Sequence, residues 1–318
     1  MPDNITPTDH NVEVNGLNIH YVDWGGDSNR NLLLVHGQGG NARNWDHIAL
    51  ALRDEFGVVA LDQRGHGESD HPREGYAVTA FASDLAEFAE KIGITPYSYV
   101  GASLGARNGI SYAGDHSDHL KHFVCLDYGP EMSVASARNQ ISGMNRRALG
   151  WRSIDEYVDQ QRINNPRLSD EYVRHQAQHA LRLNYAGKYV TKSDPDMFWI
   201  NGSFGVNEVP HLWEQWAKIS CPILELKGGE SDFLSPEIWD RMHETQPSLR
   251  FVEVPEQYPD DAWFTYNDAE CAYKCQASEY LHWLLSSVLG AQTHRCDAIA
   301  ENWKPCTREK VEETDTAG

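Results

Sequence analysis

A serine between two glycines lies where a strand-like run gives way to helical spacing. Residues 97–100 (YSYV) are aromatic and β-branched, as in a buried strand, and a helix-compatible pattern starts at Leu104. Between them lies Gly101-Ala102-Ser103-Leu104-Gly105. A sharp strand-to-helix turn strains its central residue and needs glycines where a Cβ would collide with a neighbouring element. The spacing therefore predicts that Ser103 is a nucleophile at the positive end of a helix, where a developing anion is favoured.

The elements that must position this serine alternate along the chain. Two alternating runs within 11–24, joined at Asn15-Gly16, predict a hairpin. Further strands are predicted at 31–35, 56–61, 97–100, 119–126, 221–229 and 250–254, and helices at 42–52, 78–92, 236–243, 268–289 and from 104 onward. Strands alternating with helices indicate βαβ units. We therefore expect an α/β fold with an eight-stranded, mostly parallel sheet flanked by helices.

The alternation is interrupted once. Residues 131–217 contain almost no strand signal and many helix formers, so we interpret them as an inserted helical cap over the C-terminal edge of the sheet. Residues 1–130 and 218–290 then form the α/β core. The closing segment, 291–318, is polar, and its last residues are expected to be disordered.

Composition excludes several partners. The chain has 318 residues, with 27 Lys and Arg against 47 Asp and Glu, for a net charge of −20. This balance argues against nucleic acid and anionic membranes, and no apolar run could span a bilayer. The first ten residues have no signal-peptide pattern, so we expect a cytoplasmic protein. A homodimer is left open.

The six cysteines show no spacing typical of a metal site. Cys296 and Cys306 could close a small loop in the tail, although a reducing cytoplasm disfavours that pairing. We expect neither a metal nor an organic cofactor.

Four motifs, in order, make the chain resemble the α/β-hydrolase fold superfamily over 11–289. They are HGQGG after the strand at 31–35, LDQRGHGESD from Leu61, VGASLGA around Ser103, and GGESDFLSPE after the strand at 221–229. The chain is most similar to the bacterial branch with a lid, which includes carboxylesterases, lactonases, haloperoxidase-like enzymes and carbon–carbon bond hydrolases.

The resemblance implies roles for several residues. The backbone N–H groups of Leu104 and Gln38 would form an oxyanion hole for the tetrahedral intermediate. Asp232 would orient the general base, with helix capping as its alternative role. Asp127 is the fallback acid, although we expect it to close the turn before the cap. His36 and His66 are expected to hold loops together through hydrogen bonds rather than to act in catalysis.

The chain departs from the family pattern at the histidine. In the family, a helix starts about seven residues after the catalytic histidine, and here that helix is expected at Asp268 to Glu270. The histidine position is therefore Ala262, directly before Trp263. An alanine cannot accept a proton from Ser103.

Three explanations are open. The favoured one is that this copy is a deliberately inactivated variant, with alanine in place of histidine. The second is natural loss, which would leave a non-catalytic small-molecule binding protein on the hydrolase fold. The third is a histidine from elsewhere, for which His243, His282 and His294 are candidates without supporting spacing.

The resemblance implies a serine hydrolase that cleaves a carboxylic ester or lactone of a bulky, partly apolar small molecule through an acyl-enzyme. A carbon–carbon bond hydrolase of the β-diketone type and a non-catalytic binding protein are the alternatives. Tyr128, Trp199 and Trp263 are candidate pocket residues, since aromatic side chains commonly line such pockets.

Overall fold

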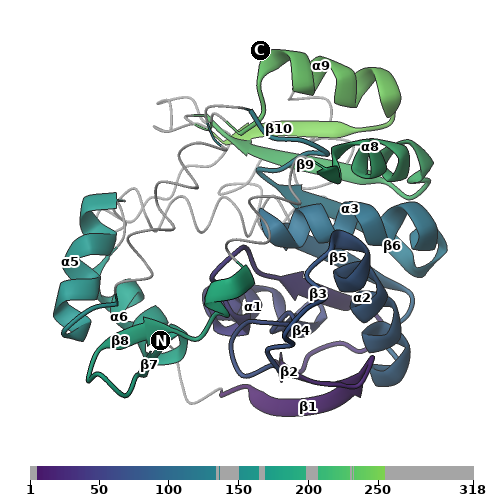
Figure 1. Ribbon diagram of the computed structural model, residues 1–318. Helices are drawn as coiled ribbons and strands as arrows, with labels where there is room; N and C mark the ends of the chain where they lie inside the picture. Colours follow the sequence, from purple (N-terminus) through teal and green to yellow (C-terminus); the bar gives the residue numbers. More distant parts are fainter. Residues whose placement is uncertain are drawn as a thin grey trace, which may run out of the picture.

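The fold is organised around one twisted sheet of eight strands (Figure 1). The computed structural model describes residues 6–133, 136, 150–164, 169–197, 207–229, 231 and 233–254. The strands lie in the order β1-β2-β4-β3-β5-β6-β9-β10. Their bounds are β1 Thr8–Val14, β2 Leu17–Asp23, β3 Asn31–Val35, β4 Gly57–Leu61, β5 Tyr97–Ala102, β6 Leu120–Leu126, β9 Ile223–Gly228 and β10 Arg250–Val254.

Strand directions confirm the predicted sheet. The β1–β2 and β2–β4 pairs are antiparallel, and every other neighbouring pair in the sheet is parallel. The antiparallel hairpin turns at Asn15 and Gly16, both with positive φ, as the Asn-Gly pair predicts. Because the carboxyl ends of parallel strands share one edge, the loops after β3, β4, β5, β6 and β9 meet there.

Side-chain alternation builds a core on each face of the sheet. Along β3, Leu33 and Val35 pack into one cluster, while Leu32 and Leu34 pack into the other. All four are completely buried, and each such leucine or valine contributes about 1.5–3 kcal/mol of transfer free energy. A strand that is buried on both faces has a continuous apolar sequence. For this reason the sequence predicts β3 with the same first and last residues as the structure.

Helices cover both faces of the sheet. Residues of α2 (Val78–Ile92), α3 (Leu104–His116), α8 (Val209–Lys218) and α9 (Pro236–Thr245) belong to the first cluster, and residues of α1 (Asp46–Leu52) belong to the second. The helix predicted over 42–52 is divided into a 3-10 turn, η1 (Ala42–Trp45), and α1. The side chains of Asn41 and Asn44 each accept a backbone N–H in a capping box, which closes this first turn separately.

The segment predicted as a helical cap contains a strand pair as well as helices. The helices are α5 (Ile154–Asn164) and α6 (Asp170–Ala180), and the strands are β7 (Leu181–Leu183) and β8 (Tyr189–Thr191). The expectation of almost no strand was therefore wrong in detail. The signal was the turn between Asn184 and Gly187, where Gly187 has a positive φ.

Helix α8 (Val209–Lys218) crosses the predicted cap boundary at 217, and it packs against α3. A Cβ on Gly114 of α3 would lie 2.8 Å from the Cα of Gln215 in α8, so the two helices approach very closely. Arg107 of α3 also forms a buried ion pair with Glu208, the residue before α8. Figure 1 shows α5, α6 and the β7–β8 hairpin on the opposite side of the molecule from α8. The cap boundary at 217 stays a prediction.

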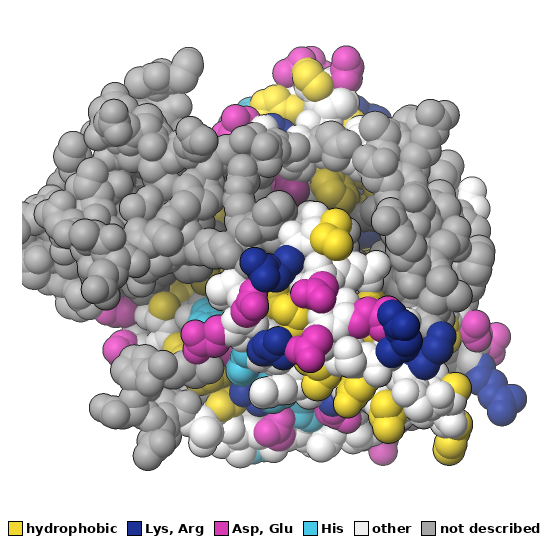
Figure 2. Space-filling view, turned by 90° about the vertical axis from the view of Figure 1, so that its left-hand side faces the viewer, with side chains coloured by type: hydrophobic (Ala, Val, Ile, Leu, Met, Phe, Trp, Pro, Cys, Tyr) yellow, Lys and Arg dark blue, Asp and Glu magenta, His cyan; other side chains and the backbone are white. Residues whose placement is uncertain are grey.

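Several predicted features lie outside the described residues. They include the helix at 268–289, the tail at 291–318, and the pair Cys296 and Cys306. Of the described cysteines, Cys125 and Cys221 are buried and free. Among the described residues, no helix has both the length and the apolar character needed to cross a bilayer. On the side that carries α5 and α6, the described acidic and basic side chains are intermixed (Figure 2).

Candidate active site

Ser103 occupies the sharp turn between β5 and α3. Its φ of 49° and ψ of −110° are strained for a residue with a Cβ, and its side chain makes no cap hydrogen bond to α3. A hydrogen bond attaches the turn to the neighbouring strand β6: the Ser103 N–H donates to the Leu126 carbonyl at 3.1 Å. The strained turn predicted from the sequence is therefore present.

Three glycines make this turn sterically feasible. A Cβ on Gly105 would lie 2.3 Å from the Val35 carbonyl oxygen, and one on Gly101 would lie 2.6 Å from the Ala106 nitrogen. In the loop after β3, a Cβ on Gly37 would lie 3.3 Å from the Cβ of Ser103. The HGQGG loop therefore passes directly beside the serine, and glycine is required for that approach.

Two backbone N–H groups lie in the segments that flank Ser103. Leu104 is the first residue of α3, so its N–H has no partner within the helix, and Gln38 follows Gly37 in the neighbouring loop. No described residue accepts a hydrogen bond from either N–H. Both donors could serve an anion, and the oxyanion hole stays a prediction.

Two buried histidines join the loops after β3 and β4. The ring of His36 accepts the Gln63 N–H at 3.1 Å and lies 2.7 Å from the Gly37 carbonyl. The ring of His66 accepts the Gly39 N–H at 3.1 Å and lies 3.1 Å from the Arg64 carbonyl. The two ring centroids are 4.7 Å apart.

These contacts fix the charge of the pair. In each ring Nδ1 faces a carbonyl and must carry the proton, while Nε2 accepts a backbone N–H. Burial lowers the pKa of His36 and lowers that of His66 well below its ordinary value. Both rings are neutral, and their lone pairs are already used. The predicted loop-holding role is confirmed.

Asp62 is a residue that the sequence reasoning missed. Its carboxylate accepts the Ala42 N–H at 2.6 Å and the Glu68 N–H at 2.9 Å, and it lies 2.8 Å from the His20 ring. Burial alone would raise the pKa of Asp62, but the hydrogen bond with His20, the nearby His36 and the two N–H donors lower it. The available signal was an aspartate directly after a buried strand, in a loop rich in glycine.

The two candidate acids lie in loops that follow β6 and β9. Asp127 has a φ of 56°, its N–H donates to the Leu226 carbonyl at 2.8 Å, and its carboxylate accepts the Ser231 hydroxyl at 2.7 Å. Asp232 follows Ser231 in the chain but lies outside the described residues. The Asp127 contacts agree with a turn-closing role, while the choice between the two acids stays a prediction.

Glu225 is a further carboxyl group that contacts the turn at Asp127 and Tyr128. Glu225 of β9 is completely buried and accepts the Tyr128 N–H at 3.2 Å. Burial raises the pKa of Glu225 well above its ordinary value, which favours the protonated form of this carboxyl group. Tyr128 itself is buried, with its ring centroid 6.3 Å from that of Phe233.

The predicted base position and two of the predicted pocket residues belong to segments that the structure does not describe. Ala262, Trp263 and Trp199 lie outside the described residues. Of the alternative histidines, His282 and His294 also lie outside. His243 is described and packs on the ring of Trp239 in α9, with centroids 4.2 Å apart. None of the described histidines forms a hydrogen bond with Ser103.

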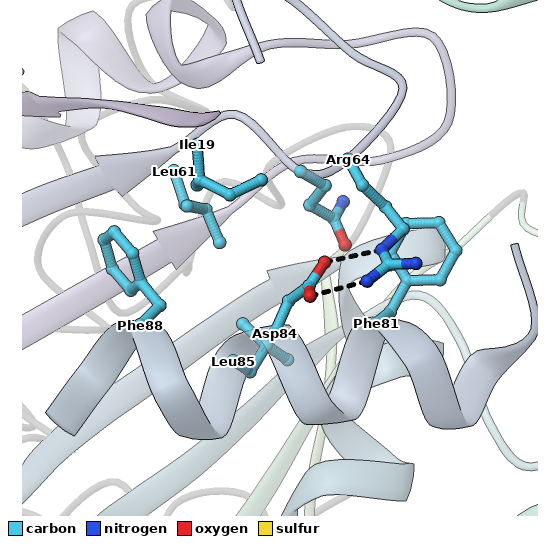
Figure 3. Close-up of a pocket in the computed structure, with 8 residues that line it drawn as sticks. Ile19, Leu61, Arg64, Phe81, Asp84, Leu85 and Phe88 are labelled. Carbon is cyan, nitrogen blue, oxygen red and sulfur yellow. Dashed lines mark hydrogen bonds and ion pairs between the residues drawn. The ribbon is translucent and has the colours of Figure 1, made fainter. Parts of the chain in front are cut away.

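A small cavity of about 10 Å³ lies between α2 and the strands β2 and β4 (Figure 3). In its lining, the Arg64 guanidinium donates two hydrogen bonds of 2.6 Å to the Asp84 carboxylate. A single water molecule needs roughly 10–15 Å³. This cavity is therefore too small for a substrate and is part of the structural core.

Comparison with known proteins agrees with this geometry. The chain is 25% identical over 224 residues to 2-(acetamidomethylene)succinate hydrolase of Mesorhizobium japonicum, covering 70% of this chain and 79% of that one. It is 24% identical over 258 residues to a 3-hydroxybutyrate-oligomer hydrolase of Cupriavidus necator, covering 74% and 85% of the two chains.

A solved structure shares the fold. The crystal structure of E-2-(acetamidomethylene)succinate hydrolase superposes with a TM-score of 0.71 at 21% identity, covering 79% of this chain and 91% of the other. A family model described as the alpha/beta hydrolase fold matches residues 30–263, a range that includes Ser103, Asp232 and Ala262. The two relatives described above are hydrolases, and the chain belongs to the α/β-hydrolase fold family.

Proposed function

We propose that this protein is a serine hydrolase that cleaves a carboxylic ester or lactone of a bulky, partly apolar small molecule. The observation that carries the proposal is the conformation of Ser103. A positive φ at a residue with a Cβ costs on the order of 1–3 kcal/mol and persists only where the surrounding structure imposes it. Here Gly37, Gly101 and Gly105 leave room for the turn, the Ser103 N–H bond to Leu126 holds it, and the turn presents a hydroxyl that caps no helix.

The proposed reaction has two halves. In the first, the Ser103 hydroxyl attacks the carbonyl carbon while a base at position 262 accepts its proton. The N–H groups of Leu104 and Gln38 stabilise the oxyanion, and the base then protonates the departing alcohol. In the second, the same base activates a water molecule that hydrolyses the acyl-enzyme and frees Ser103.

The acid that orients this base is proposed to be Asp232. The Ser231 hydroxyl donates to Asp127 at 2.7 Å, so the Asp127 carboxylate joins the turn after β6 to the loop after β9. Asp232 follows directly in the chain, in the segment between β9 and α9. That position also agrees with the chain order Ser, Asp, His of this fold.

The alanine at position 262 is proposed to make this copy inactive. Loss of one member of a catalytic triad lowers turnover by up to about 10⁶, which corresponds to ~8 kcal/mol of transition-state stabilisation. Every other group in the proposed mechanism is present in the sequence.

The test restores the base. Ala262→His should give turnover on a panel of p-nitrophenyl esters, lactones, 3-hydroxybutyrate oligomers, 2-(acetamidomethylene)succinate and β-diketones. Adding Ser103→Ala to that variant should abolish turnover. Cleavage of β-diketones alone would favour a carbon–carbon bond hydrolase. If the folded Ala262→His protein binds panel members but cleaves none of them, the chain is a binding protein and the enzyme proposal fails.

A further inference from the structure

A second group of chemically active side chains lies where α6 meets the start of α1, away from the serine turn. Asp46 is the first residue of α1, and His175 and His179 lie on α6. The His175 Nε2 atom is 2.6 Å from an Asp46 carboxylate oxygen. The centroids of the two imidazole rings are 5.0 Å apart. One ligand atom from each of the three residues lies within 4.8 Å of the others.

The spacing of the histidines suits a shared ion. Residues four apart lie on the same face of a helix, so two imidazoles at this spacing can converge on one metal. Tetrahedral zinc, with bonds of about 2.0–2.1 Å, places neighbouring ligand atoms roughly 3.3 Å apart. Side-chain rotations that close the present separations by about 1.5 Å at most would complete such a site.

The ligand set selects a class of cation. Imidazole favours zinc, copper, nickel and iron, whereas magnesium and calcium prefer sites built from oxygen ligands. Three protein ligands leave one tetrahedral position for water. Asp46 is 1% exposed and the His175 side chain is 14% exposed, so the carboxylate is shielded while one histidine is reachable from solvent. Figure 2 looks onto the side that carries α6, and histidine side chains are visible on it.

Arg43 is the group that competes with a cation. Its Nε donates to both Asp46 carboxylate oxygens at 2.8 Å, which neutralises the carboxylate. The Arg43 side chain is 20% exposed, so it can turn into solvent when a doubly charged ion takes its place.

We propose that Asp46, His175 and His179 bind one divalent transition-metal cation of the zinc class, and that this ion ties α6 to the start of α1. The ligands come from segments 129 positions apart in the chain, so the ion would cross-link the α5–α6 region to the sheet-covering α1. The ion is held by coordinate bonds from the three ligand atoms, and its oxidation state does not change. It makes no use of Ser103 or position 262.

The experiment measures metal binding by the full chain without substrate. After treatment with a chelator, the protein is titrated calorimetrically with zinc chloride, with magnesium chloride as the control salt. We expect one zinc per chain and no magnesium binding. His175→Gln and His179→Gln should each weaken zinc binding by at least about tenfold, since even an outer partner of a ligating histidine contributes 10- to 100-fold.

A matched control comes from another histidine pair. His116 and His119 have ring centroids 5.1 Å apart but are not part of a three-ligand group among the described residues. His119→Gln should bind zinc as the parent does. Cobalt(II) provides a second readout that does not depend on stability, because cobalt bound to nitrogen and oxygen ligands shows d–d absorption without a thiolate charge-transfer band.

Three results would overturn the site. They are no zinc binding by the parent chain, binding that survives both His175→Gln and His179→Gln, and a thiolate band with cobalt. Arg43→Gln should bind zinc more tightly because it removes the competitor at Asp46. An affinity that stays the same or weakens would contradict Asp46 as a ligand. All of these outcomes are independent of whether the Ala262→His variant hydrolyses an ester.

Discussion

Two histidine pairs in this molecule have similar spacing between rings but opposite surroundings. His36 and His66, with centroids 4.7 Å apart, are completely enclosed, and each ring is bonded to backbone at both nitrogens. His175 and His179, with centroids 5.0 Å apart, are half-buried on α6, and His175 forms a hydrogen bond with the carboxylate of Asp46. The first pair stabilises loops, and the second pair keeps nitrogen atoms that a cation could use.

The difference shows how to separate structural from reactive histidines in this fold. A ring whose lone pair accepts a buried backbone N–H cannot also accept the proton of Ser103 without breaking that bond. His36 and His66 lie in the loops that surround the serine turn, yet their bonding excludes them as the general base. In the proposed mechanism, the base is therefore neither His36 nor His66.

The largest expected difference between the two histidine pairs is in how much each contributes to the free energy of unfolding. His66→Ala removes the acceptor of the Gly39 N–H, which is partly buried, and the donor to the Arg64 carbonyl, which is buried. Each unsatisfied buried group costs about 1–3 kcal/mol, so the free energy of unfolding should fall by roughly 3 kcal/mol. Chemical denaturation checks this value. His179→Ala in metal-free protein is the control and should change the free energy by less than about 0.5 kcal/mol. Equal losses in the two variants would contradict the distinction between the pairs.

A smaller effect is expected on the pH dependence of stability. The pKa values of His36 and His66 are lowered in the folded protein, while the unfolded chain takes up protons near the ordinary value of 6.5. Below pH 6.5 the unfolded state binds more protons than the native state, so the free energy of unfolding decreases as the pH falls. Above pH 6.5 the pair contributes no slope.

The measurement compares denaturation curves at several pH values between about 7.5 and 5. Each neutral buried histidine contributes a slope of up to ~1.4 kcal/mol per pH unit. His20 acts in the opposite direction: burial alone would lower its pKa, but Asp62 and Asp9 raise it. We therefore compare the slope of the free energy of unfolding against pH in the parent and in His66→Gln. The His66→Gln variant should have the shallower slope. Identical slopes would show that His66 is protonated in the native state as readily as in the unfolded chain.

Much of the core could be predicted from the sequence because its patterns are local. The strand at 31–35 and the helix at 78–92 were predicted with the bounds that the structure has, since one is a continuous apolar run and the other has clear helical spacing. The turn at Ser103 was predictable for the same reason. Its glycines, its strand and its helix are all neighbours in the chain.

Features that depend on distant residues could not be predicted. Asp46 and His175 are 129 positions apart, and no periodicity links them. The hydrogen bonds of Asp62 to Ala42 and His20 likewise appear only once the loops meet at the sheet edge. The strands β7 and β8 are three residues each, too short for an alternation to stand out from the helix formers around them.

The most direct test of the central claim is covalent labelling of Ser103 with a fluorophosphonate, located by mass spectrometry of the digested protein. We predict rapid labelling of Ser103 in Ala262→His, very slow labelling in the parent chain, and none in the Ser103→Ala double variant. Labelling of the parent as fast as that of Ala262→His would show that a base other than residue 262 activates the serine. Labelling of Ala262→His at a residue other than Ser103 would contradict the assignment of the nucleophile.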